Sequence, residues 1–476
     1  MASSNQLGSV DHVVVLMLEN RSFDHMLGYL YAGSGNVSPM TGQAFAGLTG
    51  AESNPGPTGT PVGVVALTAA TPNVYFMPGA DPGEGYVPTN MQLFGQATPP
   101  DPPQATNAGF VTDFASTLIG SAVNPPVLPG TIAADIMGMF TPELLPVLSG
   151  LAQGFAVCDQ WFASVPTETF PNRAFASAAT SQGQMDDSSA KFTCQSIFGL
   201  LGGHGLDWSI YGYSNEPLTR LNFPDTASAA ESHFGLFTDF QAAAAAGTLG
   251  AYTFLEPSWG SSGNSQHPNY DVALGEQLIH DVYYALRNGP AWGETLLIVV
   301  YDEHGGCYDH VAPPLGAVPP DDTIGPSGFD FTRFGVRVPA VLVSPLVAPG
   351  TVFRPAGTVP LDHTSILKTV ETRWQLPALT ARDAAAPDLG DVLTLTAPRT
   401  DDPLGNVVVP TSTGANPAAG TPSHIQQVQA QLVSELPVPH ATGEAELGTP
   451  KLVTENDYDT YIRTRTQAWK ASRGAS

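Results

Sequence analysis

Continuous apolar runs recur along this 476-residue chain. They include "HVVVLML" at 12–18, "TLLIVVY" at 295–301 and "RVPAVLV" at 337–343. A run without polar alternation predicts a strand that is buried on both faces of a sheet. "LDWSIYGY" at 206–213 is a further strand candidate, and residues 141–165 predict a helix followed by an apolar strand.

Helical patterns lie between these runs. In residues 270–290 apolar side chains recur every four positions, namely Leu274, Leu278, Val282 and Leu286. Residues 362–375 and 454–472 begin with polar capping signals and predict two more helices. Buried strands that alternate with helices predict an α/β fold, with a mainly parallel central sheet and helices on both faces.

Composition and charge narrow the class of protein. The net charge of -26 argues against nucleic acid as a partner, because phosphate contacts need clustered Lys and Arg. It also argues against adsorption to anionic membranes, although a zwitterionic headgroup stays compatible. No apolar run reaches the roughly 18 residues of a membrane span, and the N-terminus lacks the features of a signal peptide, so we expect a soluble chain. Compartment is not determined.

Two acidic pairs follow predicted strands. Glu19 and Asn20 come after the first apolar run, and Asp302 and Glu303 come after the run at 295–301. In parallel sheets, ligands bind beyond the carboxyl ends of the strands. These oxygen ligands suit a hard divalent cation, with Ca²⁺ or Mg²⁺ favoured over Zn²⁺. The alternative for each residue is an ordinary solvated loop acid.

Thr169 precedes Pro171 in "TETFPNRAF", which predicts the first turn of a helix. A helix N-terminus presents free N–H groups to an anion. Thr169 is therefore either a nucleophile activated by a metal ion or a simple N-cap. Arg173 has two interpretations as well, a group at the helix N-terminus or a structural ion-pair partner.

Several histidines lie beside acids or helix starts. His267 stands in a loop before the helix of residues 270–290, where it suits a general acid for the leaving oxygen or is an ordinary loop histidine. His304, His310 and His363 each adjoin an acid and suit a ligand, a proton shuttle or an orienting group. We place His310 with the substrate-binding candidates. His204 is a weaker candidate.

Six segments in the same order, from about residue 9 to 380, resemble the phosphoesterase family of non-specific, phosphatidylcholine-preferring phospholipases C and related acid phosphatases. They are "DHVVVLMLENRSFDHMLGYL", "TFPNR", "QHPNYDVALGEQLIHDVYYALRNGPAW", "TLLIVVYDEHGGCYDHVAPP", "RVPAVLVSP" and "DHTSILKTVETRW". The resemblance implies an alkaline-phosphatase-like fold. It also implies a divalent metal ion held by Glu19, Asn20, Thr169, Asp302 and Glu303, with Thr169 as the nucleophile that forms a phospho-enzyme.

The same resemblance implies that Asn20 and His267 contact the phosphoryl group. Where the family commonly has a histidine after "DPP", this chain has Gln104. We therefore expect Gln104 on the substrate, where an amide donates a hydrogen bond but does not shuttle protons.

Residues 1–395 are then expected to form the catalytic domain. Within it, the Gly- and Pro-rich residues 31–113 are expected to form a long loop at its rim. Residues 396–443 are expected to be a surface connection, followed by a terminal helix that packs on the same domain.

These observations favour a metal-dependent phosphoric ester hydrolase. Its substrate is a phosphate ester, with a phospholipid headgroup as first choice and phospholipase C as the expected activity. Acid phosphatase is the second choice. The alternative from another class is a non-catalytic cation-binding protein, which only Gln104 favours.

Overall fold

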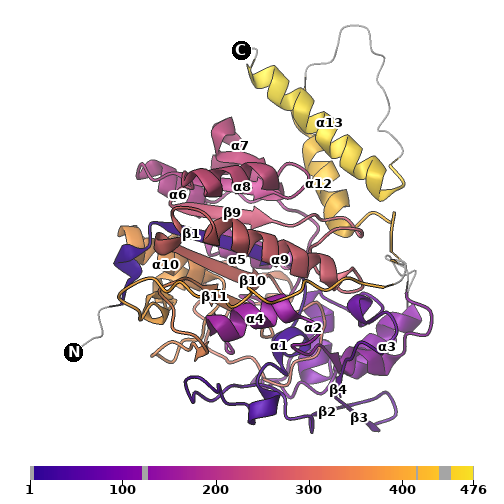
Figure 1. The fold of residues 1–476 in the computed structure, drawn as a ribbon. Helices are drawn as coiled ribbons and strands as arrows, with labels where there is room; N and C mark the ends of the chain where they lie inside the picture. The colour runs from indigo at the N-terminus through magenta and orange to yellow at the C-terminus, as the bar shows by residue number, and fades with distance from the viewer. Residues whose placement is uncertain (1–4, 121–126, 414–415, 417, 439–451, 475–476) are drawn as a thin grey trace.

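An eight-stranded sheet forms the centre of the computed structural model, which describes residues 5–120, 127–413, 416, 418–438 and 452–474 (Figure 1). Strand β11 is antiparallel to its neighbours, and the other strands of the sheet run in one direction. In spatial order the strands are β12 (Thr351–Val352), β6 (Ala156–Val157), β11 (Ala340–Val343), β10 (Thr295–Tyr301), β1 (His12–Leu18), β9 (Tyr252–Glu256), β7 (Trp208–Gly212) and β8 (Phe234–Leu236).

Two layers of helices cover the two faces of this sheet (Figure 1). One layer contains α4 (Pro146–Gly154), α9 (Val272–Arg287) and α8 (Phe237–Ala246), which contact one another in that order. The other contains α10 (Thr364–Trp374), α5 (Thr169–Ala178), α6 (Ile197–Gly203) and α7 (Pro224–Ser228), together with α11 (Ala381–Ala385) beside α10. The expected α/β fold with a mainly parallel sheet is confirmed.

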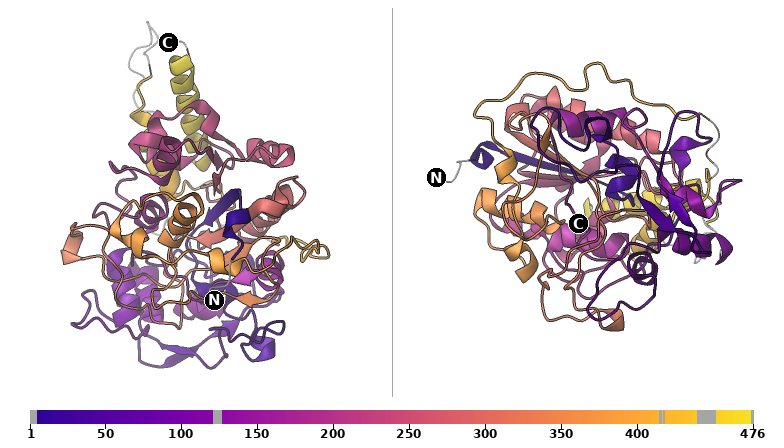
Figure 2. Two further views of the ribbon diagram at one scale, coloured as in Figure 1. Left: turned by 90° about the vertical axis from the view of Figure 1, so that its left-hand side faces the viewer. Right: turned by 90° about the horizontal axis from the view of Figure 1, so that it is seen from below.

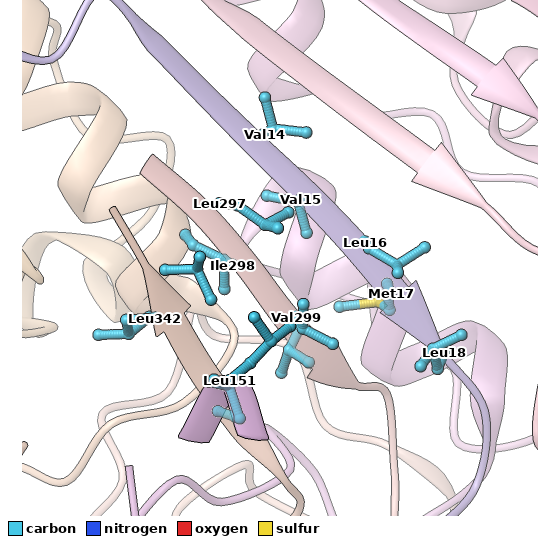
Figure 3. Close-up of a cluster of buried hydrophobic side chains, with 14 of the residues drawn as sticks. Val14, Val15, Leu16, Met17, Leu18, Leu151, Leu297, Ile298, Val299 and Leu342 are labelled. Carbon is cyan, nitrogen blue, oxygen red and sulfur yellow. The ribbon is translucent and has the colours of Figure 1, made fainter. Parts of the chain in front are cut away.

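The core lies where β1 and β10 pair in parallel register. Val15 is opposite Ile298, and both side chains are fully buried. Figure 3 shows apolar side chains of β1, β10 and β11 gathered at this centre, with Leu151 of α4 packed against them. Burial on both faces explains why these strands are continuous apolar runs rather than alternating ones.

One helical side chain differs from expectation. Leu278, Val282 and Leu286 of α9 are buried, but Leu274 is 41% exposed. Four residues turn an α-helix about 40° beyond a full turn, so a strict four-residue pattern drifts off the buried stripe. The buried face is completed by Val272 and Ile279 instead.

The rim at residues 31–113 is more structured than the loop expected there. It contains the short strands β2 (Ser53–Pro55), β3 (Pro61–Gly63) and β4 (Val65–Ala66) and the helix α2 (Tyr86–Phe94). Next come α3 (Phe110–Gly120) and β5 (Gly138–Met139), which pairs with β4, while the short helix α1 (Phe23–Leu27) connects β1 to the rim. Tertiary packing around Phe110 and Leu93 holds α2 and α3 in place, although α2 has weak helix propensity.

Two further helices pack against each other near the C-terminus, and they extend from one end of the body (Figures 1 and 2). Helix α12 (His424–Ser434) lies within the range expected to be a surface connection, and α13 (Glu455–Gly474) is the expected terminal helix. The side chain of Asp457 accepts from Thr454 N, which confirms the capping signal before α13. Among the described helices, none is both long and apolar enough to cross a membrane.

Candidate active site

The two acidic pairs meet at the carboxyl edge of the sheet. Leu18 of β1 pairs with Tyr301 of β10, so Glu19 and Asp302 leave the sheet side by side. The backbone N–H of Asn20 donates to Asp302 Oδ1 over 3.1 Å. Glu19, Asn20, Asp302 and Glu303 are all buried, so none is the solvated loop acid of the alternative interpretation.

Thr169 joins this cluster from the helical layer. It is the first residue of α5, and its Oγ1 donates to Asn20 Oδ1 over 3.3 Å. Glu168, not Thr169, occupies the N-cap position, so the interpretation of Thr169 as a simple N-cap is wrong. The side chain of Asn172 accepts from Val165 N and donates to the carbonyl oxygen of Thr167, which fixes the turn that presents Thr169.

Arg173 is an ion-pair partner within the site. Its Nε lies 2.8 Å from Asp302 Oδ2, and its Nη2 donates to the carbonyl oxygens of Met17 and Leu18 at the end of β1. The guanidinium also stacks over the ring of Trp259, 4.6 Å from its centroid. Arg173 thus fixes Asp302 through Nε, while its buried Nη1 has no hydrogen-bond partner among the described residues.

Two carboxylate oxygens at this edge are buried and have no hydrogen-bond partner among the described residues. They are Glu19 Oε1 and Glu303 Oε1. Burial, and next the charge of Asp302, raises the pKa of Glu19 to about 8, and the same two causes raise the pKa of Glu303 well above its usual range. Buried carboxyls without partners are costly, so the pair is suited to a cation that would neutralise them.

The donors available for such a cation are oxygens. Glu19 and Glu303 offer their open oxygens, and Asn20 Oδ1 and Thr169 Oγ1, which contact each other, line the same cavity as Glu19. Asp302 is already engaged, because Oδ2 meets Arg173 and Oδ1 accepts from the backbone N–H groups of Asn20 and Glu303. A set of oxygens fits Ca²⁺ or Mg²⁺ better than Zn²⁺. The residues present therefore fit the divalent metal ion that the sequence implies.

A second cluster borders the first. Asp81, Glu84 and His267 bring their ligand atoms within 4.8 Å of one another. Glu84 Oε1 accepts from Asn20 Nδ2 at 2.8 Å and lies 3.5 Å from His267 Nε2. His267 Nδ1 donates to the carbonyl oxygen of Pro268, so the imidazole turns Nε2 toward Glu84. Burial lowers the pKa of His267 to about 4.

Five acids that line the cavity are not among the sequence predictions. Asp81 and Glu84 come from the rim, Glu168 and Asp187 flank the start of α5, and Asp186 precedes Asp187. Asp187 Oδ1 accepts from Phe170 N, and Glu168 Oε2 accepts from Asp187 N. The local signal for the first two was "DPGE" at 81–84, which resembles the "DPPQ" segment at 101–104.

Glu19, Asn20 and Thr169 open into one cavity of about 520 Å³ together with the second cluster, whereas Asp302 and Glu303 lie behind its wall. A volume of this size holds more than a phosphoryl group. The residues that line the cavity are Glu19, Asn20, Asp81, Pro82, Glu84, Glu168, Thr169, Asp186, Asp187, Ser188, His267, Tyr270, Pro422, Ser423, His424 and Ile425.

Two of the expected substrate-binding residues do not line this cavity. Gln104 is exposed in a proline-rich turn of the rim. His310 Nδ1 lies 2.5 Å from Asp24 Oδ2, and Arg337 bridges Asp24 and Asp309 beside it. His310 therefore belongs to a buried ion network in which Arg337 already supplies the positive charge. The Asp-Pro segment that reaches the cavity is the one ending in Glu84.

The other candidate histidines also make hydrogen-bond contacts with groups of the protein itself. His304 Nε2 contacts Gln92 Oε1 at 2.7 Å, and His363 Nε2 donates to the carbonyl oxygen of Asp302 at 2.5 Å. Burial lowers the pKa of both. His204 is exposed, and its Nδ1 donates to the carbonyl oxygen of Leu200. Two of the three support the site, because His363 fixes the backbone of Asp302 and His304 Nδ1 lies 3.1 Å from Glu303 Oε2.

Comparison with known proteins identifies relatives over most of the chain. The Phosphoesterase family matches residues 10–377. Non-specific phospholipase C6 of Arabidopsis thaliana is 37% identical over 413 residues, which cover 82% of this chain and 74% of that protein. Phospholipase C A of Mycobacterium tuberculosis is 26% identical and covers 87% of this chain and 86% of its own.

Solved structures resemble this chain more distantly. A protein of the alkaline phosphatase superfamily from Vibrio parahaemolyticus matches with a TM-score of 0.32 and 13% identity, over 52% of this chain and 65% of its own. A putative sulfatase from Bacteroides thetaiotaomicron matches with a TM-score of 0.35 and 10% identity, over 53% and 70%.

Proposed function

Because the chain belongs to the phosphoesterase family and is a hydrolase of phosphoric esters, we propose that it is a metal-dependent phospholipase C with Thr169 as its nucleophile. The observation that carries the proposal is the contact between Thr169 Oγ1 and Asn20 Oδ1, next to the unpartnered oxygens of Glu19 and Glu303. The phospholipase C relatives support the choice of a lipid phosphodiester as substrate.

The bound metal ion would supply positive charge for the phosphoryl oxygens and lower the pKa of the threonine hydroxyl. Glu19, Asn20, Glu303 and Thr169 would hold it, and Arg173 keeps Asp302 in place at the same edge of the sheet. Thr169 Oγ1 then attacks the phosphorus, the P–O bond to the alcohol breaks, and water later hydrolyses the phospho-threonine.

His267 and Glu84 provide the proton path in this proposal. Their facing atoms, Nε2 and Oε1, lie 3.5 Å apart at the cavity wall. One proton held between them reaches the leaving oxygen in the first step, and the pair recovers a proton from the attacking water in the second. Asn20 Nδ2 orients Glu84 for this role, since it donates to the same Oε1.

A single comparison tests the reaction. We would measure hydrolysis of para-nitrophenyl phosphorylcholine and para-nitrophenyl phosphate by the wild type, Thr169→Ala and Thr169→Ser, with and without chelator. We expect chelator-sensitive turnover that Thr169→Ala abolishes and that Thr169→Ser partly retains, with a phosphorylated Thr169 peptide in acid-quenched wild type. Turnover that persists in Thr169→Ala would exclude the phospho-threonine.

The ratio between the two substrates separates the proposed activity from acid phosphatase. Preference for the phosphorylcholine diester supports phospholipase C, and preference for the monoester supports the phosphatase. The non-catalytic alternative depended on Gln104, which lies outside the cavity and so gives it no support.

A further inference from the structure

The wall of the catalytic cavity is completed by a segment far from the acidic cluster in sequence. Pro422, Ser423, His424 and Ile425 line the cavity together with Glu19 and Thr169. The family match ends at residue 377, so this wall lies beyond the part of the chain that defines the family. The groups around Thr169 lie within that part.

The segment is held firmly at the start of α12. Ser423 Oγ accepts from Gln426 N, and Gln426 Oε1 accepts from Ser423 N, which forms a reciprocal cap. The buried side of α12 packs into a small apolar cluster with Trp259 and with Phe170, the residue that follows Thr169. The helix members of that cluster are Ile425, Val428 and Leu432.

Helix α13 fixes the same segment from the other side. Glu455, its first residue, accepts from Ser261 Oγ, Ser262 N and Gly420 N. Asp459, one turn further along, accepts from Asn215 Nδ2 and Gln426 Nε2. The start of α12 is therefore tied both to α13 and to the body of the protein (Figure 2).

His424 differs from its two neighbours. Ser423 and Ile425 are buried, whereas His424 is exposed, and it is also a residue of the cavity lining. Its backbone is thus fixed while its imidazole remains open to a ligand in the cavity. The charge of His424 is one of the causes, after burial, that lower the pKa of His267, which places the two imidazoles in the same electrostatic environment.

The volume of the cavity indicates which part of a substrate contacts His424. The phosphoryl group must lie at Thr169, and the cavity of about 520 Å³ extends well beyond it. We propose that His424 is a specificity-determining residue whose imidazole packs against the second esterified group of a phosphodiester, the group that a phosphomonoester lacks. This inference rests on the proposed function and names the residue that selects diester over monoester.

The test uses two substrates that share a leaving group. Para-nitrophenyl phosphorylcholine and para-nitrophenyl phosphate both release para-nitrophenol, and they differ only in the second substituent on phosphorus. We would compare kcat/KM for the two in wild type, His424→Ala, His424→Gln and the control His204→Ala. His204 is an exposed histidine on α6's C-terminal side that does not line the cavity.

We expect His424→Ala to lower the ratio of diester to monoester kcat/KM about tenfold, mainly through KM, because the lost contact is made only to the second substituent of the diester. His424→Gln should recover part of the ratio, and His204→Ala should leave it unchanged. Because the side chain of His424 is exposed, the thermal midpoint should not move. An unchanged ratio in His424→Ala would overturn the proposal while the proposed function stands.

If the wild type hydrolyses neither substrate, the proposed function fails, and binding decides the role of His424. Calorimetry with Ca²⁺ present would then compare phosphorylcholine with inorganic phosphate. Weaker binding of phosphorylcholine alone in His424→Ala supports the assignment. Equal affinities in variant and wild type, or an equal loss for both ligands, reject it.

Discussion

Arg173 Nε lies 2.8 Å from Asp302 Oδ2 in a site where both side chains are almost fully buried. The same guanidinium rests on Trp259, which packs against α12. One cation thus connects an acid at the end of β10 with the C-terminal helices. This relationship gives Asp302 a partner, whereas Glu19, Glu303 and Asp81 each keep a buried oxygen without one.

Loss of Arg173 should be costly, because it leaves the Asp302 charge buried without its partner. We expect Arg173→Ala to lower the free energy of unfolding by about 3 kcal/mol or more. Arg463→Ala, at an exposed position of α13, should stay within about 0.5 kcal/mol. Denaturant titration followed by fluorescence measures both, and a loss below about 1 kcal/mol in Arg173→Ala would contradict the role of Arg173 as the partner of Asp302.

Removing an unpartnered acid should affect the stability of the protein in opposite directions with and without a bound metal ion. In chelator, Glu303→Gln should equal or exceed the wild type in thermal midpoint, since the amide never carries the negative charge that burial and Asp302 disfavour. With Ca²⁺ at about 100 times its Kd, the wild type should gain about 2.7 kcal/mol. The variant should gain much less.

Glu294→Gln, at an exposed position, is the control for this comparison. It should respond to Ca²⁺ as the wild type does. If Glu303→Gln also keeps the full response to Ca²⁺ and to Mg²⁺, Glu303 does not hold the ion.

Glu84→Gln should separate proton transfer from binding. The amide retains an acceptor for Asn20 Nδ2 but does not pass a proton to the leaving oxygen. We expect kcat to fall about 100-fold with KM little changed, in the range typical of general acid catalysis. Asp186→Asn, at the exposed edge of the cavity, is the matched control. A rise in KM alone would show that Glu84 acts on binding instead.

A pH effect on stability should arise far from the active site, at Glu371 in α10. Burial, and next a hydrogen bond with Asp383, raises the pKa of Glu371 to about 9, from an ordinary value of 4.5. The folded state therefore keeps a proton that the unfolded state loses above pH 4.5. The contribution of this group to stability is full below that pH and declines as the pH rises toward 9.

Glu371→Gln should flatten this dependence, because an amide donates to Asp383 at every pH. We expect the variant to exceed the wild type in thermal midpoint at pH 9 by about 2 °C, and to show no such gain at pH 4.5. The control Glu143→Gln, at an exposed position, should follow the wild-type curve. Thermal scans from pH 4.5 to 9 measure the thermal midpoint at each pH. Parallel curves for Glu371→Gln and the wild type would contradict the raised pKa of Glu371.

The carboxyl edge of the sheet was predictable from the chain itself. Runs such as 12–18 and 295–301 are apolar throughout because they are buried on both faces, and acids directly after such runs must lie at one edge of a parallel sheet. This logic placed Glu19 and Asp302 together. It also placed Thr169 at a helix start, since Pro171 and the helix pattern are local signals.

Other parts of the site have no such local signal. Gln104 and Glu84 both follow an Asp-Pro segment, and only the packing of α2 and α3 brings the second one into the cavity. Likewise the sequence left Arg173 with two interpretations, and the ion pair with Asp302 appears only when α5 packs beside β1 and β10. His424 lay within a stretch that average composition identified as a surface connection.

By itself, then, the sequence determined the sheet, its acidic edge and the nucleophile candidate, because burial and helix capping act on neighbours along the chain. The tertiary structure decided which acids keep open oxygens, which histidine faces the cavity and which distant helix closes it. Those properties depend on contacts between segments separated by up to hundreds of residues, and no local pattern records them.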